Sequence, residues 1–196
     1  MNLPNKLTMV RIFIIPFIVI IYFLSKTIDQ AVANLSLYIM GVLFIVASIT
    51  DYFDGNIARK RNIVTTFGKF IDPLADKLLV TTTLLLLSNY YYTNLNGIYM
   101  WMPFWVVLVV ITRDLIVTSI RLVAMNEGTV VAAKWSGKLK TAFTMLTISY
   151  YFFIMPFGGN VISIIGMIMT IIFVLLTIYS AVDYFLKSKH LILKEI

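Results

Sequence analysis

The sequence predicts an all-α membrane protein built from six transmembrane helices. Of its residues, 60% are hydrophobic and only 13% are charged, and the mean hydropathy is +0.93. A soluble domain carries about 25% charged residues. A globule of 196 residues has too little interior to bury this much apolar sequence. The lipid bilayer must therefore surround most of the chain.

Six apolar stretches approach the length of a membrane-spanning helix, which is about 20 residues. Polar residues, glycines and prolines separate them. The first is followed by no small-residue cleavage site, so we interpret it as an uncleaved helix and not as a signal peptide. Because the stretches use most of the chain, we expect one transmembrane domain over residues 1–196. The predicted spans are residues 10–24, 32–57, 70–91, 101–125, 140–154 and 161–185.

Basic residues predict the orientation of these helices. With six spans both termini lie on one side, and of the Lys and Arg residues near the span ends only Lys26 falls on the other side. Since Lys and Arg favour the cytoplasmic side, we expect a multi-pass cell-membrane protein with both termini in the cytoplasm. We interpret the net charge of +7 as favouring contact with an anionic membrane surface, and we expect no nucleic-acid partner.

The residue types narrow the possible chemistry. The chain has no cysteine, and its one histidine, His190, lies among lysines near the end of the sequence. Disulfides, thiolate nucleophiles and cysteine metal sites are therefore excluded. We interpret His190 as a solvated tail residue, which leaves carboxylates, basic residues and hydroxyls to carry any reaction.

Four aspartates are expected to converge at the cytoplasmic ends of the second and third predicted helices. Asp51 and Asp54 are three residues apart, and Asp72 and Asp76 are four apart, so each pair shares a helix face. A short turn joins the two helices, which makes them antiparallel neighbours. Unpaired carboxylates are costly in a membrane, whereas oxygen ligands suit Mg²⁺ or Mn²⁺. Two such ions would balance the four carboxylates and bridge the oxygens of a diphosphate.

Small and basic residues accompany these aspartates. Gly55 and Ala58 follow Asp51 on its helix face and leave room for a flat group such as a nucleobase or a ribose. Arg59 is suited to phosphate, and Gly68 shares the stripe of the third helix if that helix begins early.

The alternative is a structural salt-bridge network at the helix ends. Its cations would be Arg59, Lys60 and Lys77. Such a network does not require four aspartates at this spacing with two glycines and an alanine between them. We therefore favour the metal site.

The chain contains a motif that resembles the motif of the CDP-alcohol phosphotransferase family at every position. The resemblance implies the six-helix fold of that family, usually as a homodimer, and a CDP-linked lipid or alcohol as donor, with CMP leaving. It also implies that the four aspartates bind metal, that Asp76 is the general base, and that Gly55, Ala58, Arg59 and Gly68 line the CDP site. The motif reads Asp51-x2-Asp54-Gly55-x2-Ala58-Arg59-x8-Gly68-x3-Asp72-x3-Asp76.

Further segments resemble bacterial phosphatidylglycerophosphate synthases within that family. This resemblance implies CDP-diacylglycerol as donor and sn-glycerol 3-phosphate as acceptor, in contact with membrane phospholipid. It also adds Asn5 and Thr8 to the CDP-lipid site. The segments are Pro4-Asn5-x-Leu7-Thr8-x2-Arg11, Arg113-Asp114-x6-Arg121 and Trp135-x-Gly137-Lys138-x-Lys140-Thr141.

Three basic residues are the predicted ligands of the acceptor phosphate: Arg113, Arg121 and Lys138. Arg113 and Arg121 are eight residues apart on one face of the fourth predicted helix, and Lys134 and Lys138 open the fifth. Arg113 lies inside an apolar stretch, where an unpaired arginine is costly, so its alternative is a structural pair with an aspartate. For Lys134, Lys138 and Lys140 the alternative is a role in topology only.

The expected reaction starts with Asp76 taking the proton of the acceptor's C1 hydroxyl. The oxygen then attacks the lipid-side phosphorus of CDP-diacylglycerol, and CMP leaves. Inositol phosphate or phosphatidylglycerol as acceptor would keep this chemistry, whereas zwitterionic serine needs no such cluster of cations. A metal-dependent membrane transporter is the alternative from another class. The aspartates near one membrane face and the absence of an inverted repeat in the sequence disfavour it.

Overall fold

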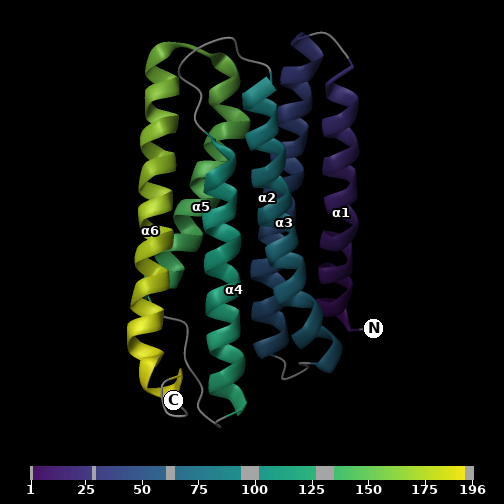
Figure 1. The fold of residues 1–196 in the computed structure, drawn as a ribbon. Helices are drawn as coiled ribbons and strands as arrows, with labels where there is room; N and C mark the ends of the chain where they lie inside the picture. Colours follow the sequence, from purple (N-terminus) through teal and green to yellow (C-terminus); the bar gives the residue numbers. More distant parts are fainter. Residues whose placement is uncertain (1, 28–29, 61–64, 94–101, 127–134, 193–196) are drawn as a thin grey trace. The chain divides into compact units, whose positions relative to one another are not determined.

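The computed structural model describes residues 2–27, 30–60, 65–93, 102–126 and 135–192. Within these ranges the chain is helical and contains no strand (Figure 1). The elements are α1 (Leu3–Ser25), α2 (Gln30–Lys60), α3 (Thr66–Thr93), α4 (Phe104–Asn126), α5 (Trp135–Phe153), the short 3-10 helix η1 (Met155–Phe157) and α6 (Asn160–Ile192).

Each predicted span corresponds to one of these helices, and most helix ends lie beyond the apolar stretches, although α4 begins only at Phe104 and α5 ends at Phe153. The first begins at Leu3, not near residue 10, because Pro4 is compatible with a first helical turn and the polar residues that follow continue the helix. Three helices contain segments that are long and apolar enough to cross a membrane: Asn5–Ser25, Val32–Asp51 and Asn160–Leu186. The all-helical membrane protein is thus confirmed, while six spans stay a prediction.

The described chain divides into two compact units. Unit 1 comprises Met1–Leu87 and Ser149–Gly158, and unit 2 comprises Ser88–Ile148 and Gly159–Ile196. Unit 1 therefore holds α1, α2, most of α3 and the end of α5. Unit 2 holds α4, most of α5 and α6. The metal-site motif falls in unit 1 and the predicted acceptor residues fall in unit 2.

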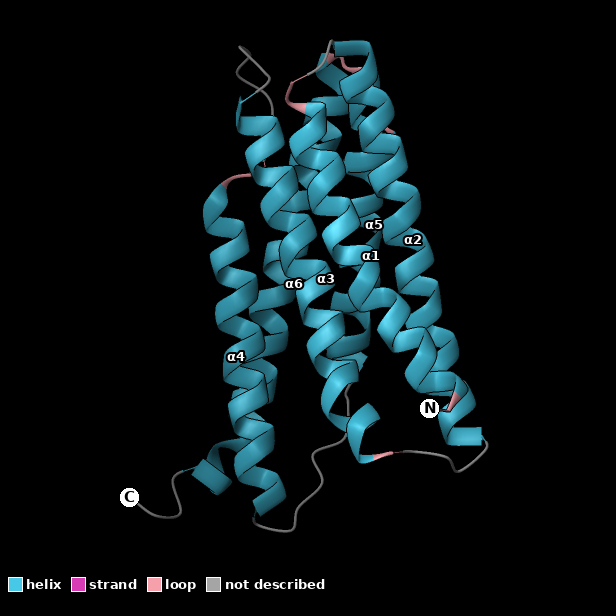
Figure 2. Ribbon diagram, turned by 90° about the vertical axis from the view of Figure 1, so that its right-hand side faces the viewer, coloured by secondary structure: helices cyan, strands magenta, loops and turns pink. Residues whose placement is uncertain are grey.

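In unit 1, α1 and α2 lie side by side (Figure 2). The end of α5 approaches α2 closely at Gly41: a Cβ atom there would lie 2.8 Å from Cβ of Phe152 and 2.8 Å from the ring of Phe153. The Phe153 ring also stacks on that of Tyr38, with 6.3 Å between centroids. Glycine at position 41 thus permits the contact that ties the end of α5 to this unit.

In unit 2, α4 packs against α6 (Figure 1). Val117, Ile120 and Tyr184 form a buried cluster between these helices. Buried threonines on α6 donate to carbonyls of their own helix, as Thr177 does to Phe173 at 2.8 Å. Because this bond satisfies the hydroxyl locally, the helix stays compatible with apolar surroundings.

Large apolar side chains are exposed on helices of both units. Phe13 and Phe17 of α1, Leu122 of α4 and Leu175 of α6 are each more than half exposed. Extensive exposed apolar surface is unusual on a soluble monomer. On membrane helices the same surface is solvated by lipid, which agrees with the apolar composition.

Candidate functional site

Asp51 of α2 is held by a buried arginine from α1. Nη1 of Arg11 lies 2.6 Å from Oδ1 of Asp51. The Arg11 side chain is completely buried, whereas the Asp51 side chain is 44% exposed. A buried guanidinium is costly without a counter-charge, and Asp51 supplies one. The pair therefore fixes the carboxylate of Asp51 while leaving part of it accessible.

Asp72 of α3 is held by the same helix. Oγ1 of Thr8, which is buried, donates a hydrogen bond of 2.7 Å to Oδ1 of Asp72. Thr8 precedes Arg11 by three residues, so the two side chains lie on one face of α1. This face contacts one carboxylate from α2 and one from α3. It brings the two halves of the aspartate motif to within about one helical turn of each other along α1.

Oxygen atoms surround Gly68 in the first turn of α3. Oγ1 of Thr65 donates to Oδ1 of Asn5 at 3.0 Å and accepts the N–H of Gly68 at 3.0 Å, as a helix N-cap does. A Cβ atom at Gly68 would lie 3.1 Å from Oδ1 of Asn5, 3.2 Å from Oγ1 of Thr65 and 3.7 Å from Oδ2 of Asp72. Glycine thus preserves a small space bordered by oxygens.

This donor set fits a hard divalent cation, which takes oxygen ligands from carboxylates and carbonyls. Asp76 lies one turn beyond Asp72 on α3 and is partly buried. Among the described side chains, no three His, Asp or Glu residues are grouped closely enough to hold a metal ion. The side chain of Asp54 lies outside the described residues, so the four-aspartate site stays a prediction.

Other predicted residues of the CDP site lie in the last turns of α2. Gly55, Ala58 and Arg59 are helical there, but their side chains lie outside the described residues. Their roles stay predictions. The counter-charge that the structure places against Asp51 is Arg11, which the sequence had not suggested as its partner.

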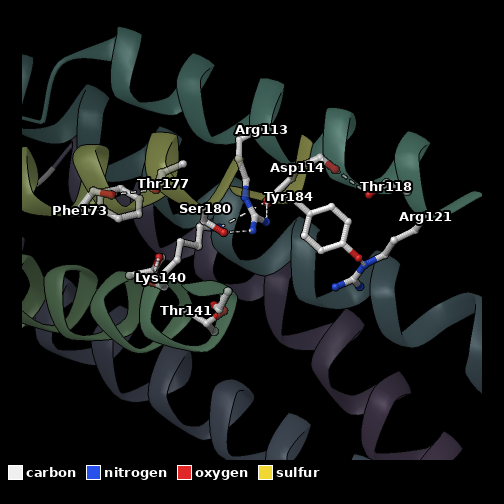
Figure 3. Close-up of polar contacts among 12 residues, drawn as sticks. Arg113, Asp114, Thr118, Arg121, Lys140, Thr141, Phe173, Thr177, Ser180 and Tyr184 are labelled. Carbon is white, nitrogen blue, oxygen red and sulfur yellow. Dashed lines mark hydrogen bonds and ion pairs between the residues drawn. The ribbon is translucent and has the colours of Figure 1, made fainter. Parts of the chain in front are cut away.

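A second polar cluster lies in unit 2, with residues from α4, α5 and α6 (Figure 3). Nη1 of Arg113 lies 2.8 Å from Oδ1 of Asp114, and Nζ of Lys140 lies 3.5 Å from the same oxygen. Nη2 of Arg113 donates to Oγ of Ser180 at 2.7 Å. The side chains of Arg113, Asp114 and Lys140 are 14%, 18% and 7% exposed. One carboxylate here faces two cations, so the Arg113–Asp114–Lys140 cluster has an excess positive charge.

The pair of Arg113 with Asp114 is the structural alternative that the sequence left open for Arg113. Within the described chain, the buried Nε of Arg113 has no hydrogen-bond partner. An open, largely apolar groove of about 290 Å³ borders Arg113 between α4 and α6. Apolar surroundings strengthen charge interactions. They therefore hold Arg113 to Asp114 and also raise its attraction for a further anion.

Arg121 faces α6 separately from this cluster (Figure 3). Its Nε donates to the hydroxyl of Tyr184 at 3.1 Å, and its guanidinium lies 5.5 Å from the centroid of that ring. Tyr184 follows Ser180 by four residues, so both arginines of α4 face one side of α6, in agreement with their spacing. Lys138 is exposed, and among the described residues it has no ion pair with the cluster. Lys140, not Lys138, joins Arg113.

Comparison with known proteins identifies the family. The model of the CDP-alcohol phosphatidyltransferase family matches residues 1–181. The chain belongs to this family. As a CDP-alcohol phosphatidyltransferase it carries an enzymatic motif, and the transporter alternative is not supported. The family is generally dependent on divalent metal, which agrees with the oxygen ligands around Gly68 and Asp72.

Similar members of the family carry related names. The chain is 42% identical to the Bacillus subtilis CDP-diacylglycerol–glycerol-3-phosphate 3-phosphatidyltransferase over 76% of this chain and 75% of the relative. It is 36% identical to the Rickettsia typhi protein of the same name over 96% and 97%. A probable phosphatidylglycerophosphate synthase of Mycobacterium tuberculosis is 33% identical over 95% and 81%.

Several contacts of this CDP-alcohol phosphatidyltransferase were not anticipated from sequence. The position of Arg11 did indicate a contact, because an arginine at the start of an apolar stretch needs a counter-charge. No such indication exists for Lys140 and Asp114, since 26 residues separate them. Ser180, 67 residues from Arg113, is one of several small polar residues on an apolar helix, and its spacing alone does not identify its partner.

Proposed function

We propose that the chain transfers the phosphatidyl group of CDP-diacylglycerol to sn-glycerol 3-phosphate, giving phosphatidylglycerophosphate and CMP. Membership of the family supplies the reaction class, and the names of the relatives supply the donor and the acceptor. The structural observation that carries the proposal is that Thr8 and Arg11, on one face of α1, bind the carboxylates of Asp72 and Asp51. Carboxylates from both halves of the motif are thereby bound by residues one helical turn apart on α1, which supports the proposed metal site.

On the donor side, Asp51, Asp54, Asp72 and Asp76 would hold Mg²⁺ or Mn²⁺, and we propose two ions. When bound, the metal would neutralise the negative charge of the diphosphate and of the leaving CMP. The proposed binding residues for the CDP-lipid are Asn5, Thr8, Gly55, Ala58, Arg59 and Gly68. The space that Gly68 leaves beside Asn5 and Thr65 supports this assignment, because a side chain there would fill it.

In the chemical step, Asp76 accepts the proton of the acceptor's C1 hydroxyl. The O–H bond breaks as a bond forms between that oxygen and the lipid-side phosphorus. The bond from this phosphorus to the oxygen of CMP breaks, and CMP leaves with the electron pair. No covalent enzyme intermediate is needed, so the chain contributes mainly positioning and electrostatics.

On the acceptor side, Arg113, Arg121 and Lys138 are the proposed phosphate ligands. The excess positive charge of the Arg113–Asp114–Lys140 cluster supports a dianionic acceptor, and so does the buried Nε of Arg113, which has no partner among the described residues. Lys140 adds to this charge. Charge-assisted bonds from arginine to phosphate are among the stronger ones in proteins. Inositol phosphate is the second candidate, because the same charges would bind its phosphate.

We further propose six membrane spans in one domain, a homodimer, and an active site open to the cytoplasm. The charge asymmetry of the loops supports this orientation. Because the chain has no cysteine, Asn62→Cys and Asn96→Cys each introduce a unique thiol. In intact cells an impermeant thiol reagent should label Asn96→Cys and not Asn62→Cys. The reverse pattern would invert the orientation.

The proposed reaction is tested with purified protein, labelled CDP-diacylglycerol and several acceptors, followed by thin-layer separation of the products. We expect CMP release and phosphatidylglycerophosphate with glycerol 3-phosphate, and little product with free glycerol, which lacks the phosphate. Faster turnover with inositol phosphate or phosphatidylglycerol would overturn the acceptor while leaving the family reaction in place. No CMP release with any acceptor would overturn the enzymatic proposal.

A further inference from the structure

α1 carries a stripe of three buried polar residues at three-residue spacing: Asn5, Thr8 and Arg11, which we call the α1 polar stripe. Most of the rest of the helix is apolar, and it exposes Phe13 and Phe17 on other faces. Burying a guanidinium, a hydroxyl and an amide on an apolar helix is unfavourable unless each finds a partner. The partners of the stripe therefore indicate why it is there.

Each residue of the α1 polar stripe contacts a different part of the carboxylate site. Arg11 pairs with Asp51 of α2, and Thr8 donates to Asp72 of α3. Asn5 accepts from Thr65, the residue that caps the start of α3 through the N–H of Gly68. One rigid helix thus reaches both aspartate-bearing helices and the turn that precedes the second of them.

Each contact with a carboxylate uses one of its two equivalent oxygens. Arg11 and Thr8 bind Oδ1 of their respective aspartates. Each of these contacts leaves Oδ2 of the same carboxylate outside the bond. Oδ2 of Asp72 instead borders the space beside Gly68, 3.7 Å from the position of a Cβ atom there. Binding one oxygen of a carboxylate fixes the direction of the other.

We propose that the α1 polar stripe is a positioning device, in which Thr8 and Arg11 orient Asp72 and Asp51 so that Oδ2 of each is presented to a divalent cation. The proposal rests on the proposed function for the presence of that cation. Thr8 and Arg11 are then positioning residues that act through the carboxylates. Arg11 also offsets the repulsion between the two carboxylates in the absence of metal, since it carries the opposite charge within contact of Asp51.

An orienting role of Thr8 and a direct role in binding the CDP-lipid have different consequences for metal affinity. If Thr8 orients Asp72, its hydroxyl matters for metal affinity even when no nucleotide is present. If Thr8 contacts only the donor, metal affinity is independent of it. A purely structural stripe would lower thermal stability without changing the metal requirement. Metal binding in the absence of substrates therefore separates these roles.

The test measures Mn²⁺ binding to the purified full chain by the loss of the electron paramagnetic resonance signal of free Mn²⁺, without CDP-diacylglycerol or acceptor. Thr8→Val removes the hydroxyl at nearly constant volume, and Thr8→Ser keeps it. Thr83→Val is the matched control in the same unit, because the buried hydroxyl of Thr83 donates only to its own helix, at Leu79. Arg11→Lys keeps the charge but loses the planar geometry that fits a carboxylate.

We expect Thr8→Val to weaken Mn²⁺ binding by about three- to tenfold, the range of one lost hydrogen bond. Thr8→Ser and Thr83→Val should bind Mn²⁺ like the unaltered protein, and Arg11→Lys should bind it more weakly. In turnover assays, excess Mn²⁺ should restore the kcat of Thr8→Val, which added metal cannot do for a merely destabilised fold.

Unchanged Mn²⁺ affinity in both Thr8→Val and Arg11→Lys would overturn the proposal, whether or not stability or the KM for CDP-diacylglycerol changed. Absence of Mn²⁺ binding by the unaltered protein would overturn it as well. Failure of the proposed function is distinguishable: it would appear as missing product with glycerol 3-phosphate, while Mn²⁺ binding and its dependence on Thr8 persisted.

Discussion

The two polar regions of the molecule are built alike but with opposite charge. In the described part of unit 1, the buried cation Arg11 pairs with Asp51, and Asp72 is bound by Thr8 on the same face of α1. In the described part of unit 2, the carboxylate of Asp114 is 18% exposed and pairs with two cations, Arg113 and Lys140. Among these residues, unit 1 has one cation and two carboxylates, and unit 2 has one carboxylate and two cations. In each region the ion of the less frequent sign, which we call the minority ion, pairs with residues of the other sign, and a net charge of that other sign remains.

This difference matches the two reactants of the proposed transfer. An excess of carboxylate oxygen attracts a divalent cation and, through it, a diphosphate. An excess of guanidinium and ammonium attracts a free phosphate monoester. The minority ion lowers the cost of collecting like charges in apolar surroundings. Charge balance therefore indicates which reactant each region binds.

Removal of divalent metal should have the largest effect. Because the proposed metal ligands are carboxylates and the chain has no cysteine, excess EDTA should abolish CMP release, and added Mg²⁺ or Mn²⁺ should restore it. The measurement is CMP release before and after chelation, with total metal determined on the same protein. Full turnover in EDTA with no retained metal would contradict the proposal that the aspartates of unit 1 bind a metal required for the reaction.

Asp76→Asn should have the next largest effect. Loss of a general base lowers kcat by about 10²- to 10⁴-fold, and the KM for CDP-diacylglycerol should change much less, because Asp76 ends the aspartate stripe and is proposed to face the acceptor. Asp72→Ala is the contrasting variant and should weaken both Mn²⁺ and donor binding. Near-normal turnover of Asp76→Asn would assign the base elsewhere.

Arg113→Gln should raise the KM for glycerol 3-phosphate by about ten- to a hundredfold, since a charge-assisted hydrogen bond contributes roughly 1.5–3 kcal/mol. The KM for CDP-diacylglycerol should change far less. Lys138→Gln should act in the same direction, and Lys26→Gln serves as the control, because Lys26 contacts the ring of Tyr22 in unit 1. If Arg113→Gln lowered thermal stability and affected both substrates equally, Arg113 would be a structural partner of Asp114 only.

The smallest effects should come from two glycines, one in each region. Gly68→Ala places a Cβ atom 3.1 Å from Oδ1 of Asn5 and 3.2 Å from Oγ1 of Thr65, so it should raise the KM for the donor by several-fold, on the order of 1 kcal/mol for mild overpacking. Gly137→Ala meets no described atom within 4 Å and should leave both KM values unchanged. Equal kinetics for the two variants would show that the space beside Gly68 is not used.

The sequence predicted the elements of this fold well because apolar stretches of membrane length leave few alternatives to helices. It also predicted that Arg113 and Arg121 share a helix face, since their spacing of eight residues follows from helical geometry, and both contact α6. Boundaries were less predictable: the polar start of α1 has no apolar signal, yet it is helical from Leu3.

Partners across helices could not be predicted in the same way. The pairing of Arg11 with Asp51 and of Lys140 with Asp114 depends on how helices pack, which residue spacing does not specify. Lys138 and Lys140 are two residues apart, and only the rotation of α5 decides that Lys140 is buried against Asp114 while Lys138 is exposed. Sequence periodicity gives the face of a helix but not the neighbour that the face meets.

The opposite charge preference of the two regions is tested most directly by measuring two affinities on the same variants. Binding of Mn²⁺ and of labelled glycerol 3-phosphate is determined for the unaltered protein, Asp72→Asn and Arg113→Gln, without CDP-diacylglycerol. We expect Asp72→Asn to lose Mn²⁺ affinity and keep glycerol 3-phosphate affinity, and Arg113→Gln to keep Mn²⁺ affinity and lose glycerol 3-phosphate affinity. If Asp72→Asn weakened only glycerol 3-phosphate binding, or Arg113→Gln weakened only Mn²⁺ binding, the assignment of the two regions would be contradicted.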